Sequence, residues 1–217
     1  MHVGTALAVM IYFRSRVLEL LRQAKLTLVE RVVCPYIYNF SLATLTTVIL
    51  AFLMKDLASK LGRQPGLIAL NLVVFGLLMY LTDLKKKSTN FNPYKHKDPL
   101  FAVFMGIFQV LAVFPGVSRS GVTLTFSRLK GLSRQLASDF SFLLSLPIIL
   151  GGFFYEVTKN FHQLQFDLAT MTYGIFISFI VGIFTIHFFL KFIKSFGFLS
   201  FFIYRLMLSL IIFIYLF

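Results

Sequence analysis

Long apolar runs separated by short polar gaps constrain the fold of this chain more than any other feature of its sequence. A helix that spans a bilayer needs about 20 mostly apolar residues, with a range of roughly 17 to 25. Only 13% of the residues are charged and 58% are hydrophobic, and a soluble domain of this size could not bury so much apolar surface. The sequence therefore predicts an all-α, polytopic membrane protein. The runs that are long enough to span are residues 36–54, 65–82, 137–157, 168–190 and 199–217.

The distribution of Lys and Arg predicts how the shorter apolar runs lie. Residues 100–114 and 121–130 are too short to span alone, as are residues 3–13. Gaps rich in Lys and Arg mark the cytoplasmic side of a membrane protein. All the basic gaps lie on one side only if residues 100–114 and 121–130 enter and leave the membrane on that same side. We therefore expect a re-entrant helix–loop–helix with its tip, residues 115–120, inside the membrane. The gaps rich in Lys and Arg are residues 14–31, 83–99, 128–134 and 191–198, and the poor gaps are residues 55–64 and 158–167.

The net charge of +13 does not indicate a nucleic-acid partner. A basic chain can bind nucleic acid, but here the basic residues lie in the gaps between apolar runs and not on a polar domain. The one cysteine, Cys34, excludes a disulfide within the chain and a thiolate metal cluster. Because no linker or low-complexity segment interrupts the pattern, we expect one transmembrane domain over residues 1–217.

Residues 115–123, at the expected tip, read PGVSRSGVT and concentrate groups that bind anions. Gly116 and Gly121 permit tight turns and close approach to a ligand. A helix that begins at Ser120 or Gly121 would turn its free N–H groups toward the loop, as in known anion sites. Arg119 adds a planar fork of donors that suits phosphate oxygens. Hydroxyl groups come from Ser118, Ser120 and Thr123.

These residues alone leave the chemistry open. An arginine in the membrane can also extend to the interface or pair with a buried acid. Helices broken near the middle of the membrane hold anionic substrates in transporters. The loop therefore predicts an anion site, with phosphate as the first candidate, and it does not separate hydrolysis from binding or transport.

Several stretches resemble the undecaprenyl-pyrophosphate phosphatase (bacitracin-resistance) family. The most specific is GIFQVLAVF at 106–114 followed by PGVSRSG at 115–121. Residues 137–147 and the entry to the last helix at 201–205 are also similar to that family. Residues 2–9 are similar to the segment that follows the family's first catalytic motif. The resemblance covers essentially the whole chain.

The resemblance implies an enzyme that converts undecaprenyl pyrophosphate to undecaprenyl phosphate, which recycles the lipid carrier for cell-wall synthesis and confers bacitracin resistance. It implies an inverted-repeat helical bundle in the bacterial plasma membrane, with an active site open to the outer side. A divalent cation, Mg²⁺ or Ca²⁺, is the implied cofactor, and a homodimer is a further expectation. The implied catalytic residues are Arg119 and Ser118, and the implied pyrophosphate-binding residues are Gly116, Ser118, Arg119, Ser120, Gly121 and Thr123.

One departure from the family pattern stands out. The family's other half-site, a glutamate-rich motif followed by Ser-Ser-x-Gly-His, has no match here. We therefore expect an N-terminally truncated chain that lacks the first re-entrant half-site and contains no metal ligands of its own. Asp139 is expected to serve as a structural partner for a basic residue or as a first-turn acid of its helix. The alternatives to a phosphatase are a lipid-phosphate binding or transport protein and an inactive remnant.

Overall fold

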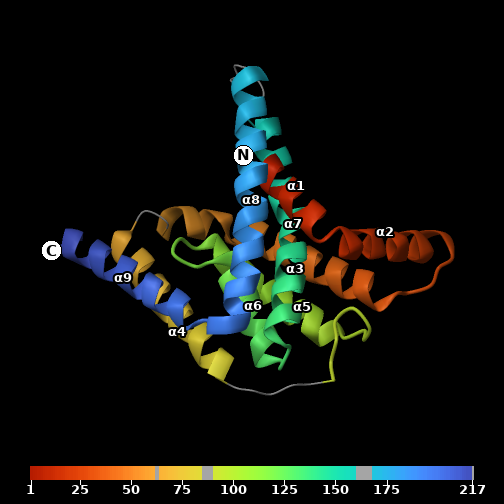
Figure 1. The fold of residues 1–217 in the computed structure, drawn as a ribbon, viewed down its shortest axis with the longest axis horizontal. Coiled ribbons are helices and arrows are strands. Elements are labelled where there is room, and N and C mark those ends of the chain that lie inside the picture. Colours follow the sequence, from red (N-terminus) through yellow and green to blue (C-terminus); the bar gives the residue numbers. More distant parts are fainter. Residues whose placement is uncertain (62–63, 85–89, 160–167, 217) are drawn as a thin grey trace.

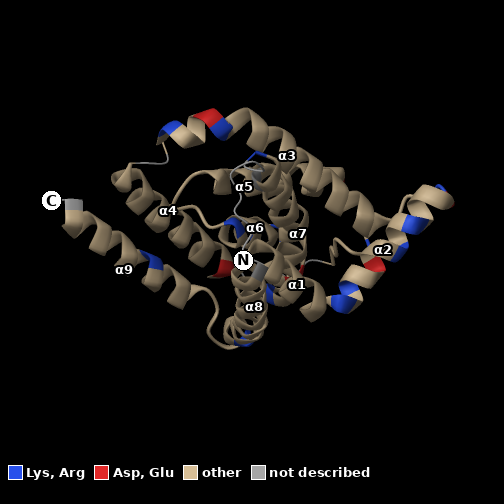
Figure 2. Ribbon diagram, turned by 90° about the horizontal axis from the view of Figure 1, so that it is seen from above, with Lys and Arg blue, Asp and Glu red and all other residues tan. Residues whose placement is uncertain are grey.

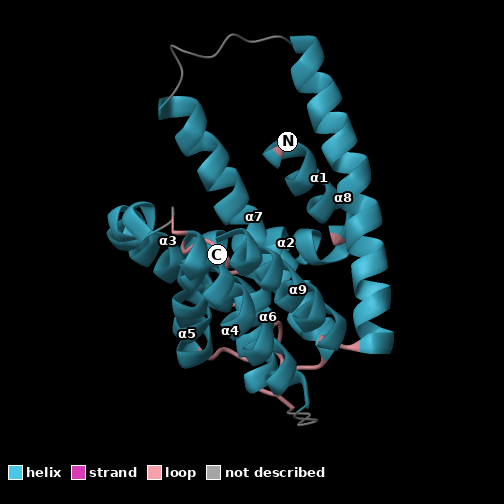
Figure 3. Cartoon of the chain, turned by 90° about the vertical axis from the view of Figure 1, so that its left-hand side faces the viewer, coloured by secondary structure: helices cyan, strands magenta, loops and turns pink. Residues whose placement is uncertain are grey.

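The computed structural model describes residues 1–61, 64–84, 90–159 and 168–216, and these residues form helices and loops without any strand (Figure 3). The all-α prediction is therefore confirmed. The helices are α1 (His2–Tyr12), α2 (Arg14–Val29), α3 (Pro35–Leu61), α4 (Pro65–Leu84), α5 (Pro99–Val110), the 3₁₀ turn η1 (Leu111–Val113), α6 (Arg119–Leu129), α7 (Arg134–Lys159), α8 (Leu168–Phe196) and α9 (Leu199–Leu216).

Four helices, α3, α4, α7 and α8, are long and apolar enough to cross a membrane. The helix α9, which was also expected to span, has 18 residues and lies at the lower end of the spanning range. Large apolar side chains on these helices remain exposed, as on α8, where Phe184 keeps 59% of its surface exposed. A polytopic membrane protein accounts for this exposure, because lipid covers the apolar surface. The single domain over residues 1–217 and the inverted repeat stay predictions.

The short helix–loop–helix hairpin predicted from charge is present, and its re-entrant position in the membrane stays a prediction. The helix α5 has 12 residues, which gives a length of about 18 Å, well short of a hydrocarbon core of about 30 Å. Phe101 near the start of α5 packs on Phe126 near the end of α6, with 5.7 Å between ring centroids. The two helices therefore run antiparallel, and the chain enters and leaves the hairpin at the same end of the molecule.

The basic gaps meet at this same end. The Arg16 guanidinium, after α1, lies 4.3 Å from the centre of the Tyr94 ring, in the loop before α5. Asp83 at the end of α4 accepts hydrogen bonds of 2.9 and 2.8 Å from Arg134 at the start of α7. Arg134 and Lys194, near the end of α8, line one cavity together with Arg16. This arrangement agrees with the charge-based topology; most of the poor gap 158–167 lies outside the described residues.

Residues 14–31, predicted as a basic gap between apolar runs, contain the helix α2, which the prediction did not specify. Figure 1 shows α2 lying crosswise to α8 and extending away from the helical body. Figure 2 shows that Lys and Arg residues are frequent along the ribbon of α2. No residue of α2 is buried. A basic helix that also carries several leucines suits the membrane interface, where its apolar groups enter the lipid and its charges meet the head groups.

The helix α6 occupies the centre of the bundle, where α4, α5 and α7 pack around it (Figure 1). Every residue from Gly121 to Arg128 is buried. At its basic end, Arg128 Nε lies 3.1 Å from Asp83 Oδ1, so that α4, α6 and α7 share one acid. The first turn of α6, which carries the PGVSRSG motif, is thereby held in a fixed position at the opposite end of the helix.

Candidate functional site

Ser118 sets the start of α6 and hence the geometry of the motif. It is the N-cap residue, with an extended backbone, and its Oγ accepts a 3.2 Å hydrogen bond from the N–H of Gly121. Serine favours this position because its side chain satisfies one free N–H of the first turn. The helix therefore begins at Arg119, slightly before the predicted start at Ser120 or Gly121. Within the described part of the chain, the N–H groups of Arg119 and Ser120 have no acceptor, as an anion site at a helix N-terminus requires.

Arg119 is half-buried, and its guanidinium has no hydrogen-bond or ion-pair partner among the described residues. Arg119 therefore does not pair with a buried acid among the described residues. By contrast, Arg128 and Arg134 both meet the carboxylate of Asp83. Of these arginines, Arg119 is the one whose donors stay available for a ligand.

The hydroxyl groups of the motif divide into two sets. Ser118 Oγ and Ser120 Oγ lie 3.3 Å apart at the N-terminus of α6, beside the free N–H groups. Thr123 is 1% exposed, and its hydroxyl donates within the helix, to the carbonyls of Arg119 and Ser120, and contacts Ser141 Oγ. The structure thus brings Ser118 and Ser120 together with Arg119. The binding role of Thr123 stays a prediction, and its observed partners give it a structural one.

Gly116 is the position in the loop that only glycine fits. Its φ angle is +82°, in the left-handed region that side chains disfavour. A Cβ at this position would lie 2.5 Å from the carbonyl oxygen of Ile68 in α4. Gly121 is under less constraint, since a Cβ there would lie 3.1 Å from the Cβ of Ser118. Close packing of the loop on α4 therefore requires glycine at 116.

Two residues that the sequence analysis did not assign to the site hold the loop from outside. The amide nitrogen of Asn71 in α4 donates a 2.8 Å hydrogen bond to the carbonyl of Pro115. The guanidinium of Arg205 in α9 donates to the carbonyls of Gly116 and, at 3.1 Å, of Leu72. Each is a polar side chain in an otherwise apolar run, and that is the signal by which the sequence could have identified both.

The described residues do not fit a divalent cation by themselves. They include no group of three or more His, Cys, Asp or Glu side chains that could hold a metal ion. The loop offers hydroxyls, N–H groups and a guanidinium, which suit an anion, whereas Mg²⁺ and Ca²⁺ prefer several carboxylate or carbonyl oxygens. Asp139 lies in the second turn of α7, not the first, and makes no ion pair within the described residues. Among the residues that the structure describes, Asp83 is the acid that forms ion pairs, with Arg128 and Arg134.

Comparison with known proteins settles the family. The sequence model of the family described as "Bacitracin resistance protein BacA" matches residues 1–211. The chain belongs to the BacA family.

Several curated relatives agree with this assignment. A protein of Caldicellulosiruptor bescii named undecaprenyl-diphosphatase is 34% identical over 213 residues, which are 98% of this chain and 79% of the relative. A protein of the same name from Aliivibrio salmonicida is 36% identical over 212 residues, which are 96% of this chain and 79% of the relative. An undecaprenyl-diphosphatase 1 of Pseudoalteromonas translucida is 35% identical over 215 residues, with the same coverage. The resemblance first seen in the PGVSRSG motif is therefore confirmed over most of the BacA-family chain.

Proposed function

We propose that this BacA-family protein hydrolyses undecaprenyl pyrophosphate to undecaprenyl phosphate and inorganic phosphate. The observation that carries the proposal is the first turn of α6, where the unpaired guanidinium of Arg119 joins free N–H groups and the hydroxyls of Ser118 and Ser120. The names of the relatives supply the substrate, and the membrane-embedded position of the loop suits a phosphate carried by a lipid.

The residues of the loop act by binding and orienting the pyrophosphate. The oxygen of a water molecule attacks the terminal phosphorus, the bond from this phosphorus to the bridging oxygen breaks, and undecaprenyl phosphate leaves. The water gives up its protons to the surrounding solvent and phosphate products. Negative charge on the pyrophosphate is met by Arg119 and by the N–H groups of Arg119 and Ser120. Ser118, whose Oγ already accepts from Gly121, donates its hydroxyl proton toward a phosphate oxygen.

The cellular setting follows from the same proposal. The protein resides in the bacterial plasma membrane with its basic end in the cytoplasm, so that the hairpin tip faces the outer side and receives substrate from there. Recycling of the lipid carrier supports cell-wall synthesis and raises bacitracin resistance. A divalent cation, Mg²⁺ or Ca²⁺, is the proposed cofactor; it would neutralise phosphate charge, and the described residues do not supply its ligands by themselves. A homodimer is the proposed assembly.

Phosphate release from the purified chain tests this function. The protein is reconstituted in detergent micelles with undecaprenyl pyrophosphate that is radiolabelled in its terminal phosphate, and free phosphate is measured over time. Release that depends on Arg119 is the expected result. The matched control is Arg22→Ala, since Arg22 is an exposed arginine on α2 outside the loop.

Lipid-phosphate binding or transport is the second candidate, because the described residues contain no metal-ligand group. In the same experiment, a transport protein retains labelled lipid on the protein and releases no phosphate. An inactive remnant does neither, and it elutes as broad or aggregated material in gel filtration. A phosphatase, a transport protein and an inactive remnant thus give three different results in this experiment.

A further inference from the structure

A cavity of about 470 Å³ opens at the basic end of the molecule, where α1, α7 and α8 meet. No residue of the PGVSRSG loop lines it. Its charged lining residues are Arg16 in the first turn of α2, Arg134 and Asp139 near the start of α7, and Lys191 and Lys194 near the end of α8. The cavity is therefore a second concentration of charge, separate from the candidate catalytic loop.

The charges of this cavity do not cancel. Arg134 is paired with Asp83 outside the cavity. The side-chain amines of Lys191 and Lys194 form no ion pair or hydrogen bond with any described residue. Asp139 is the one acid in the lining. The excess of positive charge indicates an anionic ligand.

The depth of the cavity in the membrane narrows the class of ligand. The helix α8 has 29 residues and is thus about 43 Å long, more than a hydrocarbon core of about 30 Å can cover. Lys191 and Lys194 lie in the last two turns of this helix. Their amines are therefore placed at the level of the lipid head groups.

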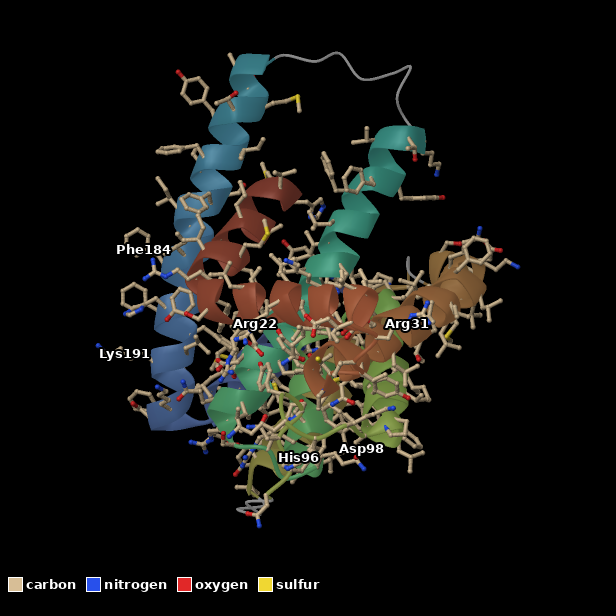
Figure 4. All side chains as sticks on the ribbon, turned by 90° about the vertical axis from the view of Figure 1, so that its right-hand side faces the viewer. Arg22, Arg31, His96, Asp98, Phe184 and Lys191 are labelled. Carbon is tan, nitrogen blue, oxygen red and sulfur yellow. The ribbon has the colours of Figure 1, made fainter. Side chains whose placement is uncertain are left out.

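An apolar groove of about 910 Å³ adjoins the cavity, between α8 and α9. Lys191 lines both. The groove is walled mainly by phenylalanines, and Phe188 keeps 60% of its surface exposed. Figure 4 shows Phe184 and Lys191 on the same side of α8, both directed away from the bundle. A phosphate at Lys191 would consequently have a hydrocarbon-lined path directly beside it.

We propose that the cavity and the groove together bind one anionic phospholipid of the surrounding bilayer. Its phosphate lies against Lys191 and Lys194, and an acyl chain lies in the phenylalanine-lined groove. Basic pockets between membrane helices on the cytoplasmic side have the chemistry that binds such head groups. A hydroxylated head group, as in phosphatidylglycerol, also finds acceptors in Asp139 and Ser138, whereas the excess positive charge disfavours phosphatidylcholine. The proposal does not depend on hydrolysis at the PGVSRSG loop.

The absence of tryptophan from the chain allows a direct test. A Phe188→Trp variant places a single fluorophore in the groove, and a Leu45→Trp variant places one on the exposed surface of α3. Each variant is reconstituted in vesicles that contain either phosphatidylglycerol or phosphatidylcholine with brominated acyl chains. We expect quenching in the groove to favour phosphatidylglycerol by about fivefold or more in association constant, the factor that corresponds to one or more lysines near the head groups. The fluorophore on α3 should show little preference.

Charge removal identifies the source of the preference. In the Phe188→Trp background, Lys191→Gln with Lys194→Gln should abolish the preference, whereas Lys25→Gln with Lys95→Gln, which removes equal charge from exposed positions elsewhere, should keep it. Equal quenching by both lipids would overturn the proposal. So would no quenching by either lipid, which would mean that a protein surface covers the groove. Displacement by undecaprenyl phosphate but not by unlabelled phosphatidylglycerol would also overturn it, since the occupant would then be the polyprenyl lipid.

Discussion

The guanidinium of Arg205 donates to the carbonyl of Gly116, so that the last helix, α9, holds the loop in which Arg119 lies. Arg205 is 9% exposed, and its second contact, to the carbonyl of Leu72, ties the same side chain to α4. Arg205 thus fixes the loop against two helices, whereas the guanidinium of Arg119 has no partner among the described residues. The two arginines have different roles, and substitutions should separate them.

Replacement of Arg119 should remove catalysis and leave the fold intact. The guanidinium contacts no described partner that would be lost, whereas loss of one preorganised donor to developing charge costs about 100-fold or more in rate. We expect Arg119→Ala to lower phosphate release by at least about that factor at an unchanged melting temperature. Arg119→Lys should recover only part of the activity, because an ammonium cannot form the bidentate contact. Near-normal release from Arg119→Ala would refute the assignment of the site.

Replacement of Arg205 should act through loop position. Arg205→Lys keeps the positive charge but replaces the planar guanidinium by a single ammonium, which cannot reach both carbonyls. We expect kcat/KM to fall by about tenfold or more, the factor for one lost hydrogen bond to a charged group. In a protein that already carries Arg119→Ala, the Arg205→Lys exchange should add little to the loss. If the effects of the two exchanges multiplied in full, Arg205 would act independently of the loop.

Gly116→Ala should disturb the loop more than the same exchange at Gly121. The positive φ angle and the close approach to Ile68 both oppose a side chain, and the strain costs of order 1–3 kcal/mol. A lower melting temperature and a loss of phosphate release are expected together. The control is Gly151→Ala on α7, where a Cβ would meet no atom within 4 Å; a comparable loss there would point to a general effect of the exchange.

Asp83→Asn should destabilise the basic end of the bundle. Asp83 is 8% exposed and faces both Arg128 and Arg134, and removal of one partner of a buried ion pair costs about 3–5 kcal/mol. The melting temperature in detergent should fall clearly. Asp56→Asn removes an equal charge from an exposed position of α3 and should leave the melting temperature unchanged. Equal stability of the two variants would mean that Asp83 contributes no net stabilisation.

Removal of divalent cations tests the proposed cofactor. Because hard cations match phosphate oxygens, we expect a chelator to abolish phosphate release and either Mg²⁺ or Ca²⁺ to restore it. Heat-stability measurements in the same buffers should change little, since the described residues contain no group that could hold a metal as part of the fold. A full reaction rate in excess chelator would rule the cofactor out.

The sequence predicted the hairpin because charge and length are both local, countable quantities. It also predicted which residues gather at the tip, since PGVSRSG is continuous in the chain. It treated residues 14–31 as a gap because a search for spanning runs passes over an amphipathic helix such as α2. The predicted start of α6, at Ser120 or Gly121, is too late because Ser118 caps the helix and the helix begins at Arg119.

The supports of the site were missed for a different reason. Asn71 and Arg205 reach the loop across 44 and 89 residues of sequence, and no local pattern encodes such pairings. The same holds for Asp83, which meets Arg128 and Arg134 from another helix. A single polar residue in an apolar run indicates that a partner exists, but only the packing of the helices identifies that partner.

The shortness of α5 also determines how substrate arrives. Because the hairpin turns back before it crosses the bilayer, a lipid can present its head group to the tip while its tail stays in the same leaflet. Encounter is then a two-dimensional search within the membrane. At saturating total amounts of lipid, inert lipid that dilutes the substrate within the vesicle should slow the reaction in proportion to the surface mole fraction of the substrate. Dilution of the same vesicles with buffer should leave the rate per protein unchanged.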